Sequence, residues 1–375
     1  MIKVNTKFDA GSIEVIDISN LNNLRFKIRS DTNSDFRQWF YFELSGVLGK
    51  DLTIKLEDLK KTAYPNAWEN YSVVTSYDNS SWFRTEAEFD GDKLTFNITP
   101  EKNKIYFAYF EPYSYARHVE LVNGALNSEN VVYESLGETK EGRSIDLLIL
   151  GNKKAENKIW ITARQHPGET MAEWFMEGLI DKLLETSDAT STKLLRDNAF
   201  YLVPNMNPDG AYNGNLRVNG VGINLNREWL SPTREKSPEV FVVRRKMLET
   251  GVDMFFDIHG DETIPYIFTA GCEDNPSYSE KQRSIRAKFA YFFELINPDY
   301  QTKYGYDKGH FKKETPMLAT NWVGDKFDCL ALTLEMPFKD NDNLPDAING
   351  WDGQRSYNLG QSLLTAINCV LSAKG

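Results

Sequence analysis

Three strand-like apolar runs in the last two-thirds of the chain each lead to an ionisable residue, namely His166, His259 and Glu335. Apolar runs of this length, separated by helical patterns, are typical of buried strands in an α/β sheet. Ligand sites in such sheets lie at the carboxyl ends of the strands. We therefore expect these three residues to meet at one edge of a single sheet.

Strands and helices alternate from about residue 126 onwards, and apolar residues at helical spacing mark the helices. The predicted helices cover residues 169–184, 237–250, 278–295, 319–327 and 354–371. The predicted strands cover residues 200–204, 252–259 and 329–335, with a hairpin in 128–150. This alternation indicates an α/β sheet covered by helices on both faces.

The first 125 residues follow a different pattern, in which polar and apolar residues alternate at a period of two. The alternating segments are residues 23–29, 38–44, 52–58 and 104–110. We therefore predict an N-terminal antiparallel β-sandwich domain in residues 1–125 and an α/β domain in residues 126–375. The aromatic run from Trp39 to Tyr41 is interpreted as core packing in preference to a binding surface.

Composition excludes several classes of protein. The formal net charge is −11, which disfavours nucleic-acid partners and anionic membrane surfaces. The N-terminus has no apolar stretch typical of a secretory signal, and no apolar run approaches the length of about 18 residues that a membrane span needs. Cys272, Cys329 and Cys369 form no CxxC pair. We therefore expect a cytoplasmic protein with free thiols and no nucleic-acid or membrane partner.

His166 and Glu169 lie three residues apart, between a strand and a helix, and offer two metal ligands. His259 supplies a third, and a His₂Glu set is a catalytic zinc environment with one position left open. We therefore predict one Zn²⁺ per chain. Glu335 would stand over the open position as the general base. A single histidine at a strand end is more often structural, so the prediction rests on the combination.

The segment 203–229 is rich in Gly and Asn and is predicted to be a loop. An arginine near a metal suits carboxylate recognition or oxyanion stabilisation. Arg227 with Asn226 could grip a substrate carboxylate, and Arg217 could face a developing oxyanion. Either arginine alone would more often be a surface residue.

Together these motifs resemble the M14 (carboxypeptidase A-like) zinc metallocarboxypeptidases. The motifs are His166-Pro-Gly-Glu169, Asn207-Pro-Asp-Gly210, Arg217, Asn226-Arg227, Asp257-Ile-His259 and Leu334-Glu335. The HPGE form, with the aromatic segments 38–42 and 107–115 upstream, resembles the cytosolic carboxypeptidase subfamily. The resemblance covers nearly the whole chain. It implies an N-terminal β-sandwich followed by a carboxypeptidase A-like α/β domain with a mixed central sheet.

The resemblance also implies a reaction, the removal of a C-terminal residue (or a side-chain-linked amino acid) from a peptide or protein. The implied assignments are zinc on His166, Glu169 and His259, acid–base catalysis by Glu335, polarisation of the scissile carbonyl by Arg217, and binding of the C-terminal carboxylate by Asn226 and Arg227.

Two departures from the family pattern concern substrate recognition. Digestive members have an arginine immediately before the ligand glutamate, where this chain has Gly168. Members that remove glutamate have a basic residue shortly upstream of the general base. In this chain the comparable segment is 317–326, and its only basic residue is Lys326, at its end. A substrate-contacting tyrosine is expected as well, and Tyr304 and Tyr306 are both candidates by position.

Two other functions remain open from the sequence. A related zinc amidohydrolase of small N-acyl amino acids would share the metal ligands. A non-catalytic binding protein on the same fold should have lost a ligand or the base, and this chain keeps all of them. The oligomeric state and the preferred C-terminal residue stay undetermined.

Overall fold

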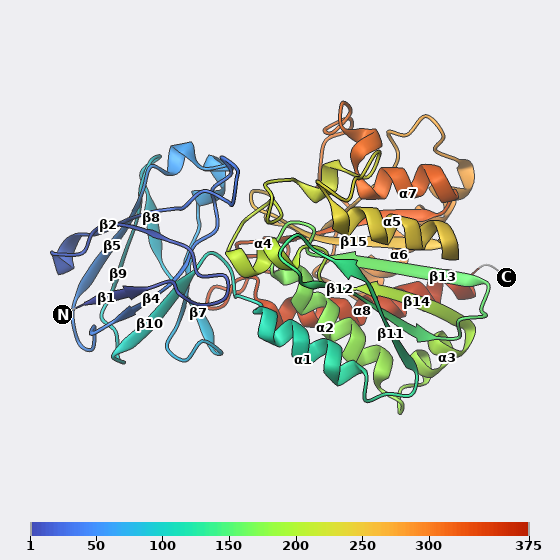
Figure 1. The fold of residues 1–375 in the computed structure, drawn as a ribbon, viewed down its shortest axis with the longest axis horizontal. Coiled ribbons are helices and arrows are strands. Elements are labelled where there is room, and N and C mark those ends of the chain that lie inside the picture. The colour runs from blue at the N-terminus through green and yellow to red at the C-terminus, as the bar shows by residue number, and fades with distance from the viewer. Residues whose placement is uncertain (1, 374–375) are drawn as a thin grey trace.

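The computed structural model describes residues 2–373. An all-β N-terminal part lies beside a larger α/β part, and the chain passes from one to the other once (Figure 1). The fold class expected from the sequence is confirmed, including the mixed central sheet. No helix within residues 2–373 is long and apolar enough to span a lipid bilayer.

The N-terminal part consists of two five-stranded sheets packed face to face. The first sheet contains β1 (Lys3–Asn5), β4 (Tyr41–Ser45), β10 (Lys104–Ala108), β6 (Val73–Ser76) and β7 (Trp82–Thr85), in that order. The second contains β2 (Glu14–Asp17), β3 (Leu24–Lys27), β5 (Leu52–Glu57), β9 (Leu94–Ile98) and β8 (Ala87–Phe89). Neighbouring strands run antiparallel, apart from the parallel pair β3–β5.

Period-two alternation places one side of each sheet in the core of the sandwich. Phe26 and Phe96 of one sheet contact Phe42 and Phe107 of the other, with Phe26 and Phe42 5.0 Å apart between ring centroids and Phe96 and Phe107 5.2 Å apart. The run from Trp39 to Tyr41 is buried, so its interpretation as core packing is confirmed.

The larger part is built on a seven-stranded mixed sheet. Its order is β11 (Val131–Glu138), β12 (Ser144–Gly151), β14 (Asn198–Val203), β13 (Asn157–Ala163), β15 (Met254–Asp261), β17 (Leu330–Pro337) and β16 (Phe268–Gly271). The four strands β14, β13, β15 and β17 are parallel, whereas β11, β12 and β16 run antiparallel to their neighbours. The carboxyl ends of the parallel strands therefore share one edge.

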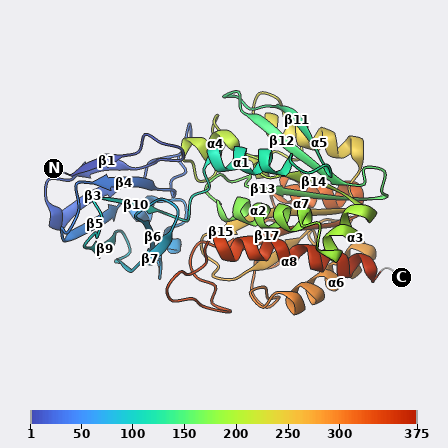
Figure 2. The ribbon, with the colours of Figure 1, turned by 90° about the horizontal axis from the view of Figure 1, so that it is seen from below.

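Helices cover both faces of this sheet, as Figures 1 and 2 show. One layer contains α1 (Tyr115–Ala125), α2 (Met171–Leu184), α3 (Ala189–Asp197), α6 (Glu280–Ile296) and α8 (Gly353–Ser372). The other contains α5 (Pro238–Thr250) and α7 (Ala319–Phe327). Ile159 and Ile161 pack into the first core and Trp160 into the second, because successive strand residues point to opposite faces.

The prediction that residues 203–229 form only a loop is wrong. The segment contains α4 (Pro208–Asn213) and a 3₁₀ turn, Leu225–Arg227. Proline at the first helical position and the Asn207 side chain, which accepts from the Gly210 N–H at 3.0 Å, start α4. The prediction of free thiols is confirmed, because all three cysteines are unpaired.

Candidate active site

Strand register brings the predicted residues together at the carboxyl edge of the sheet. His259 on β15 stands directly opposite Glu335 on β17. His166 follows β13, the other neighbour of β15. Between β13 and His166, Arg164 takes a left-handed backbone conformation (φ 59°). Its buried guanidinium holds the turn by donating to the Pro167 carbonyl at 2.9 Å.

The two imidazoles and the Glu169 carboxylate converge on one point. Nδ1 of His166 lies 2.7 Å from Glu169 Oε1, and Nδ1 of His259 lies 2.7 Å from Glu169 Oε2. The two Nδ1 atoms are 3.2 Å apart, and all three side chains are buried. Lone pairs this close repel one another unless a cation lies between them. The donor set therefore fits zinc.

The far nitrogens of both histidines have acceptors of their own. Nε2 of His259 lies 2.8 Å from Asp257 Oδ2, and Nε2 of His166 lies 3.1 Å from Asn224 Oδ1. An acceptor there keeps the proton on Nε2 and leaves the Nδ1 lone pair free for a metal. Asp257 is itself held by Thr162 Oγ1, which donates to it at 2.7 Å.

The surrounding charges shift the pKa values of the two imidazoles in opposite directions. Burial and the positive charge of Arg217 lower the pKa of His166 to about 4, so this ring is neutral at neutral pH. Burial also lowers the pKa of His259, but Asp257 and Glu169 outweigh it and raise that pKa well above its usual value. Asp257 and Glu169 thus favour a positive charge at the position of His259.

Glu335 has the environment of a proton-transfer group. Burial raises the pKa of its carboxyl well above the usual value, Glu169 and Asp261 raise it further, and His259 and Tyr306 lower it. Its Oε2 atom has no hydrogen-bond partner among residues 2–373. A general base with one free oxygen beside a metal site can take a proton from water and return it later.

Of the two tyrosines that are candidates for substrate contact by position, Tyr306 lines the cavity. Its hydroxyl lies 2.9 Å from Asp261 Oδ2 and 3.0 Å from Glu335 Oε1. One hydroxyl carries one proton, so both contacts are hydrogen bonds only when one carboxyl is protonated, which agrees with the raised pKa of Glu335. Tyr304 instead stacks on Tyr266 with ring centroids 4.3 Å apart.

Arg217 is positioned from the N-terminal part of the molecule. The Asp31 carboxylate accepts the backbone N–H groups of Leu216, Arg217 and Val218 at 2.7, 2.7 and 3.3 Å. The guanidinium carbon lies 5.7 Å from the ring of Phe36 and 5.7 Å from that of Tyr64. A fixed cation over aromatic rings is thus held beside the metal ligands.

Asn226 and Arg227 also line the site, next to the start of α7. Asn226 Oδ1 accepts the Ala319 N–H at 2.9 Å, which turns its amide nitrogen toward His259. The Arg227 guanidinium pairs with Glu314 and lies 5.4 Å from the ring of Phe311. Glu314 is half-exposed, so a substrate carboxylate can compete with it. No pattern in the sequence indicates this pairing, because the two residues come from separate segments.

One cavity of about 340 Å³ contains the whole set. Its lining includes all seven predicted site residues, namely His166, Glu169, Arg217, Asn226, Arg227, His259 and Glu335. Residues that sequence reasoning did not single out complete it, among them Tyr64, Asp261 and Glu262. The arrangement places a His₂Glu group that could hold a metal, a further buried carboxyl and two arginines around one cavity.

Comparison with known proteins decides the family. A zinc carboxypeptidase family model matches residues 124–350, and a model of the cytosolic carboxypeptidase N-terminal domain matches residues 4–110. The chain belongs to the zinc carboxypeptidases. It is a metallocarboxypeptidase, a hydrolase that acts on peptide bonds.

Relatives of this zinc carboxypeptidase include bacterial and animal proteins. An uncharacterized protein of Zymomonas mobilis is 41% identical over 98% of this chain and 96% of its own length. Human cytosolic carboxypeptidase 1 is 28% identical over 72% of this chain, and the match spans 26% of the human protein.

Solved structures agree along the full chain. The metallo-carboxypeptidase of Burkholderia cenocepacia superposes with a TM-score of 0.98, at 45% identity and 100% coverage of both chains. A metallo-carboxypeptidase of Pseudomonas aeruginosa, solved in complex with (2-guanidinoethylmercapto)succinic acid, superposes with a TM-score of 0.96 at 44% identity, covering 99% of both chains.

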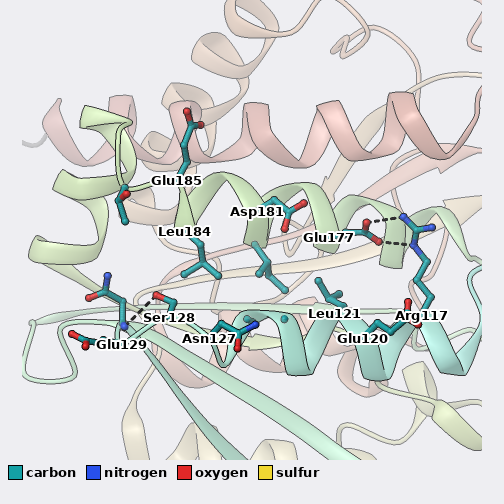
Figure 3. A pocket seen from close by; sticks show the side chains of 15 residues that line it. Arg117, Glu120, Leu121, Asn127, Ser128, Glu129, Glu177, Asp181, Leu184 and Glu185 are labelled. Atoms are coloured by element: carbon teal, nitrogen blue, oxygen red, sulfur yellow. Dashed lines mark hydrogen bonds and ion pairs between the residues drawn. The ribbon is translucent and has the colours of Figure 1, made fainter.

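The carboxypeptidase also has a larger hollow, of about 1020 Å³, between α1 and α2 (Figure 3). Its wall is acidic, and Arg117 donates to Glu177 across it at 2.8 and 2.7 Å. The described residues that line it include no histidine and no cysteine. The candidate metal-binding group lines the smaller cavity instead.

Proposed function

We propose that this chain removes the C-terminal residue of a peptide or protein, with zinc held by His166, Glu169 and His259. The observation that carries the proposal is the convergence of both Nδ1 atoms on Glu169, with the free Oε2 of Glu335 in the same cavity. When bound, zinc would act as a Lewis acid that polarises a carbonyl and acidifies water.

The chain's own residues would do the rest of the work. Arg227 and the Asn226 amide would bind the terminal carboxylate, which orients the last peptide bond. Arg217 would stabilise the negative charge that develops on the scissile carbonyl oxygen. Glu335 would accept a proton from the attacking water and donate it to the leaving amine. Tyr306, bonded to Glu335, would help to orient that carboxyl.

We propose that the leaving residue has a neutral side chain. Arg217 and Arg227 are the only lysine or arginine residues among the described residues that line the cavity. Both are assigned above to backbone groups of the substrate, namely the scissile carbonyl and the terminal carboxylate. Lys326 is exposed on α7 and lies outside the cavity. Among the described lining residues, no lysine or arginine is left to pair with a glutamate side chain.

A peptide library varied at the C-terminal residue tests the function. Zinc-loaded protein should release the terminal residue and leave C-terminally amidated peptides intact, because these lack the carboxylate that Arg227 binds. A parallel set of N-acyl amino acids tests the amidohydrolase alternative. Hydrolysis of that set with no release from peptides would contradict the proposal, and inertness toward both sets would favour a non-catalytic binding protein.

We further propose a cytoplasmic location and a domain boundary between residues 125 and 126. The names of the cytosolic relatives and the three free thiols support the location. The two matched family models, 4–110 and 124–350, support two units. The helix α1 packs on α2 through His118 and Glu173, and the proposed boundary falls directly after its last residue.

A further inference from the structure

Glu262 is a buried acidic residue of the active-site cavity that the proposed mechanism does not use. It directly follows β15, lines the cavity and is 5% exposed. Its Oε1 atom has no hydrogen-bond partner among residues 2–373. A buried carboxyl without a partner costs folding free energy, so its retention points to a ligand that is bound only during function.

The neighbours of Glu262 place it at the junction of the two parts of the molecule. Burial raises the pKa of Tyr64 and of Tyr109, both from the N-terminal part, and the nearby Glu262 carboxyl raises each pKa further. Burial also raises the pKa of Glu262 itself, Glu169 and Asp261 add to this, and Arg217 opposes it. The carboxyl therefore lies on the side of the cavity where Arg217 lies.

Among the described residues that line the cavity, acidic side chains outnumber lysines and arginines by four to two. Four acidic residues line it, namely Glu169, Asp261, Glu262 and Glu335. Arg227 is paired with Glu314 and would bind the terminal carboxylate of the substrate. Zinc would neutralise Glu169. Glu262 is outside the metal-ligand group, so zinc does not account for it.

The direction of the substrate follows from the proposed function, on which this inference rests. The leaving residue lies toward Arg227, and the scissile carbonyl faces Arg217. The retained part of the substrate then continues past Arg217 toward Tyr64, where Glu262 stands.

We propose that Glu262 is a subsite for a positively charged nitrogen on the residue that precedes the scissile bond. Two sources share this chemistry: the free α-ammonium of a dipeptide, and the side chain of a lysine or arginine in a longer peptide. A charge-assisted hydrogen bond from such a group would satisfy the orphaned carboxylate oxygen.

Two matched pairs of substrates separate these sources, all with the same neutral C-terminal residue. The first pair is an alanyl dipeptide and its N-acetyl form. The second is an N-acetyl dipeptide with lysine before the terminal residue and its norleucine counterpart, which has similar bulk and no charge. The ratio of kcat/KM within each pair is measured for zinc-loaded wild type, Glu262→Gln and the control Glu120→Gln, an exposed carboxylate on α1.

Wild type should favour the charged member of at least one pair by about tenfold or more. Glu262→Gln should reduce that ratio to about one, while Glu120→Gln leaves it unchanged. A preference in the first pair alone assigns the α-ammonium, and one in the second alone assigns the side chain. Circular dichroism and zinc content verify folding, and Glu262→Met repeats the comparison with an apolar side chain of similar length.

Equal rates within both pairs for wild type would overturn the subsite while leaving the carboxypeptidase activity intact. The same holds for a preference that survives Glu262→Gln and Glu262→Met. Failure of wild type to hydrolyse any of the four substrates or the peptide library would instead contradict the proposed function.

Discussion

The two parts of the molecule contribute to one cavity in different ways. The seven-stranded sheet supplies His166, His259 and Glu335 from the ends of adjacent parallel strands, so their spacing is set by strand register. The β-sandwich contributes through Asp31 and Tyr64, which hold or contact the loop that bears Arg217. The proposed metal site is thus built at the edge of one sheet, whereas the position of Arg217, the proposed oxyanion-binding residue, depends on contact between the two parts.

The largest expected effect is the loss of the base from the sheet edge. Glu335→Gln keeps the shape of the side chain and cannot accept a proton, so we expect hydrolysis to fall by about 10²–10⁴-fold or more. Zinc content by elemental analysis should stay at the wild-type level. Full activity of the variant on a peptide that wild type cleaves would refute the assignment.

Two buried aspartates make the comparison sharper, because each supports one half of the site. Asp257→Asn should weaken zinc binding by about 10–100-fold, because the Nε2 proton of His259 loses its carboxylate acceptor. A chelator competition titration measures this. Zinc affinity equal to that of wild type would show that Asp257 does not tune the ligand.

Asp31→Asn should leave zinc affinity unchanged and lower kcat/KM by about tenfold, because the Leu216–Val218 N–H groups lose a charged acceptor and Arg217 shifts. In an Arg217→Ala background the substitution should have little further effect. The nearby exposed Asp35→Asn is the control. An undiminished effect without Arg217 would mean that Asp31 acts on general stability.

The smallest effect on catalysis is expected from a substitution in α1, which packs on α2. Burial lowers the pKa of His118, but Glu173 and Asp146 raise it to about 9. The charged ring therefore contributes stability of the order of 3 kcal/mol, present in full below pH 6.5 and lost as the pH rises through about 9. Urea unfolding at pH 7 and pH 10 measures this. His118→Gln should reduce the difference in unfolding free energy between pH 7 and pH 10. A variant that keeps the wild-type difference would show that other groups cause it.

The sequence alone indicated which residues meet at the edge of the sheet, but not how the β-sandwich supports Arg217. A strand end followed by histidine or glutamate is a local signal, and parallel register then brings such residues together. Asp31 lies 186 residues before Arg217, and no local pattern marks it as the support of that loop. Position alone could not separate Tyr306 from Tyr304, because only tertiary packing directs one of them to Glu335.

The short helix α4 shows a second limit. It lies in a segment, 203–229, that is rich in Gly and Asn, which favour loops. Asn207 and Pro208 nevertheless start a short helix there, and a left-handed Gly214 ends it. The pairing of Arg227 with Glu314 was equally hidden, because the two residues come from separate segments.

Zinc content of wild type and His259→Ala, measured by elemental analysis alongside peptide hydrolysis, tests the central claim most directly. We predict one zinc per chain and C-terminal release for wild type, and lowered zinc with lost release for His259→Ala. Unchanged metal content in His259→Ala, or release by wild type that persists after a chelator has removed all zinc, would contradict the account.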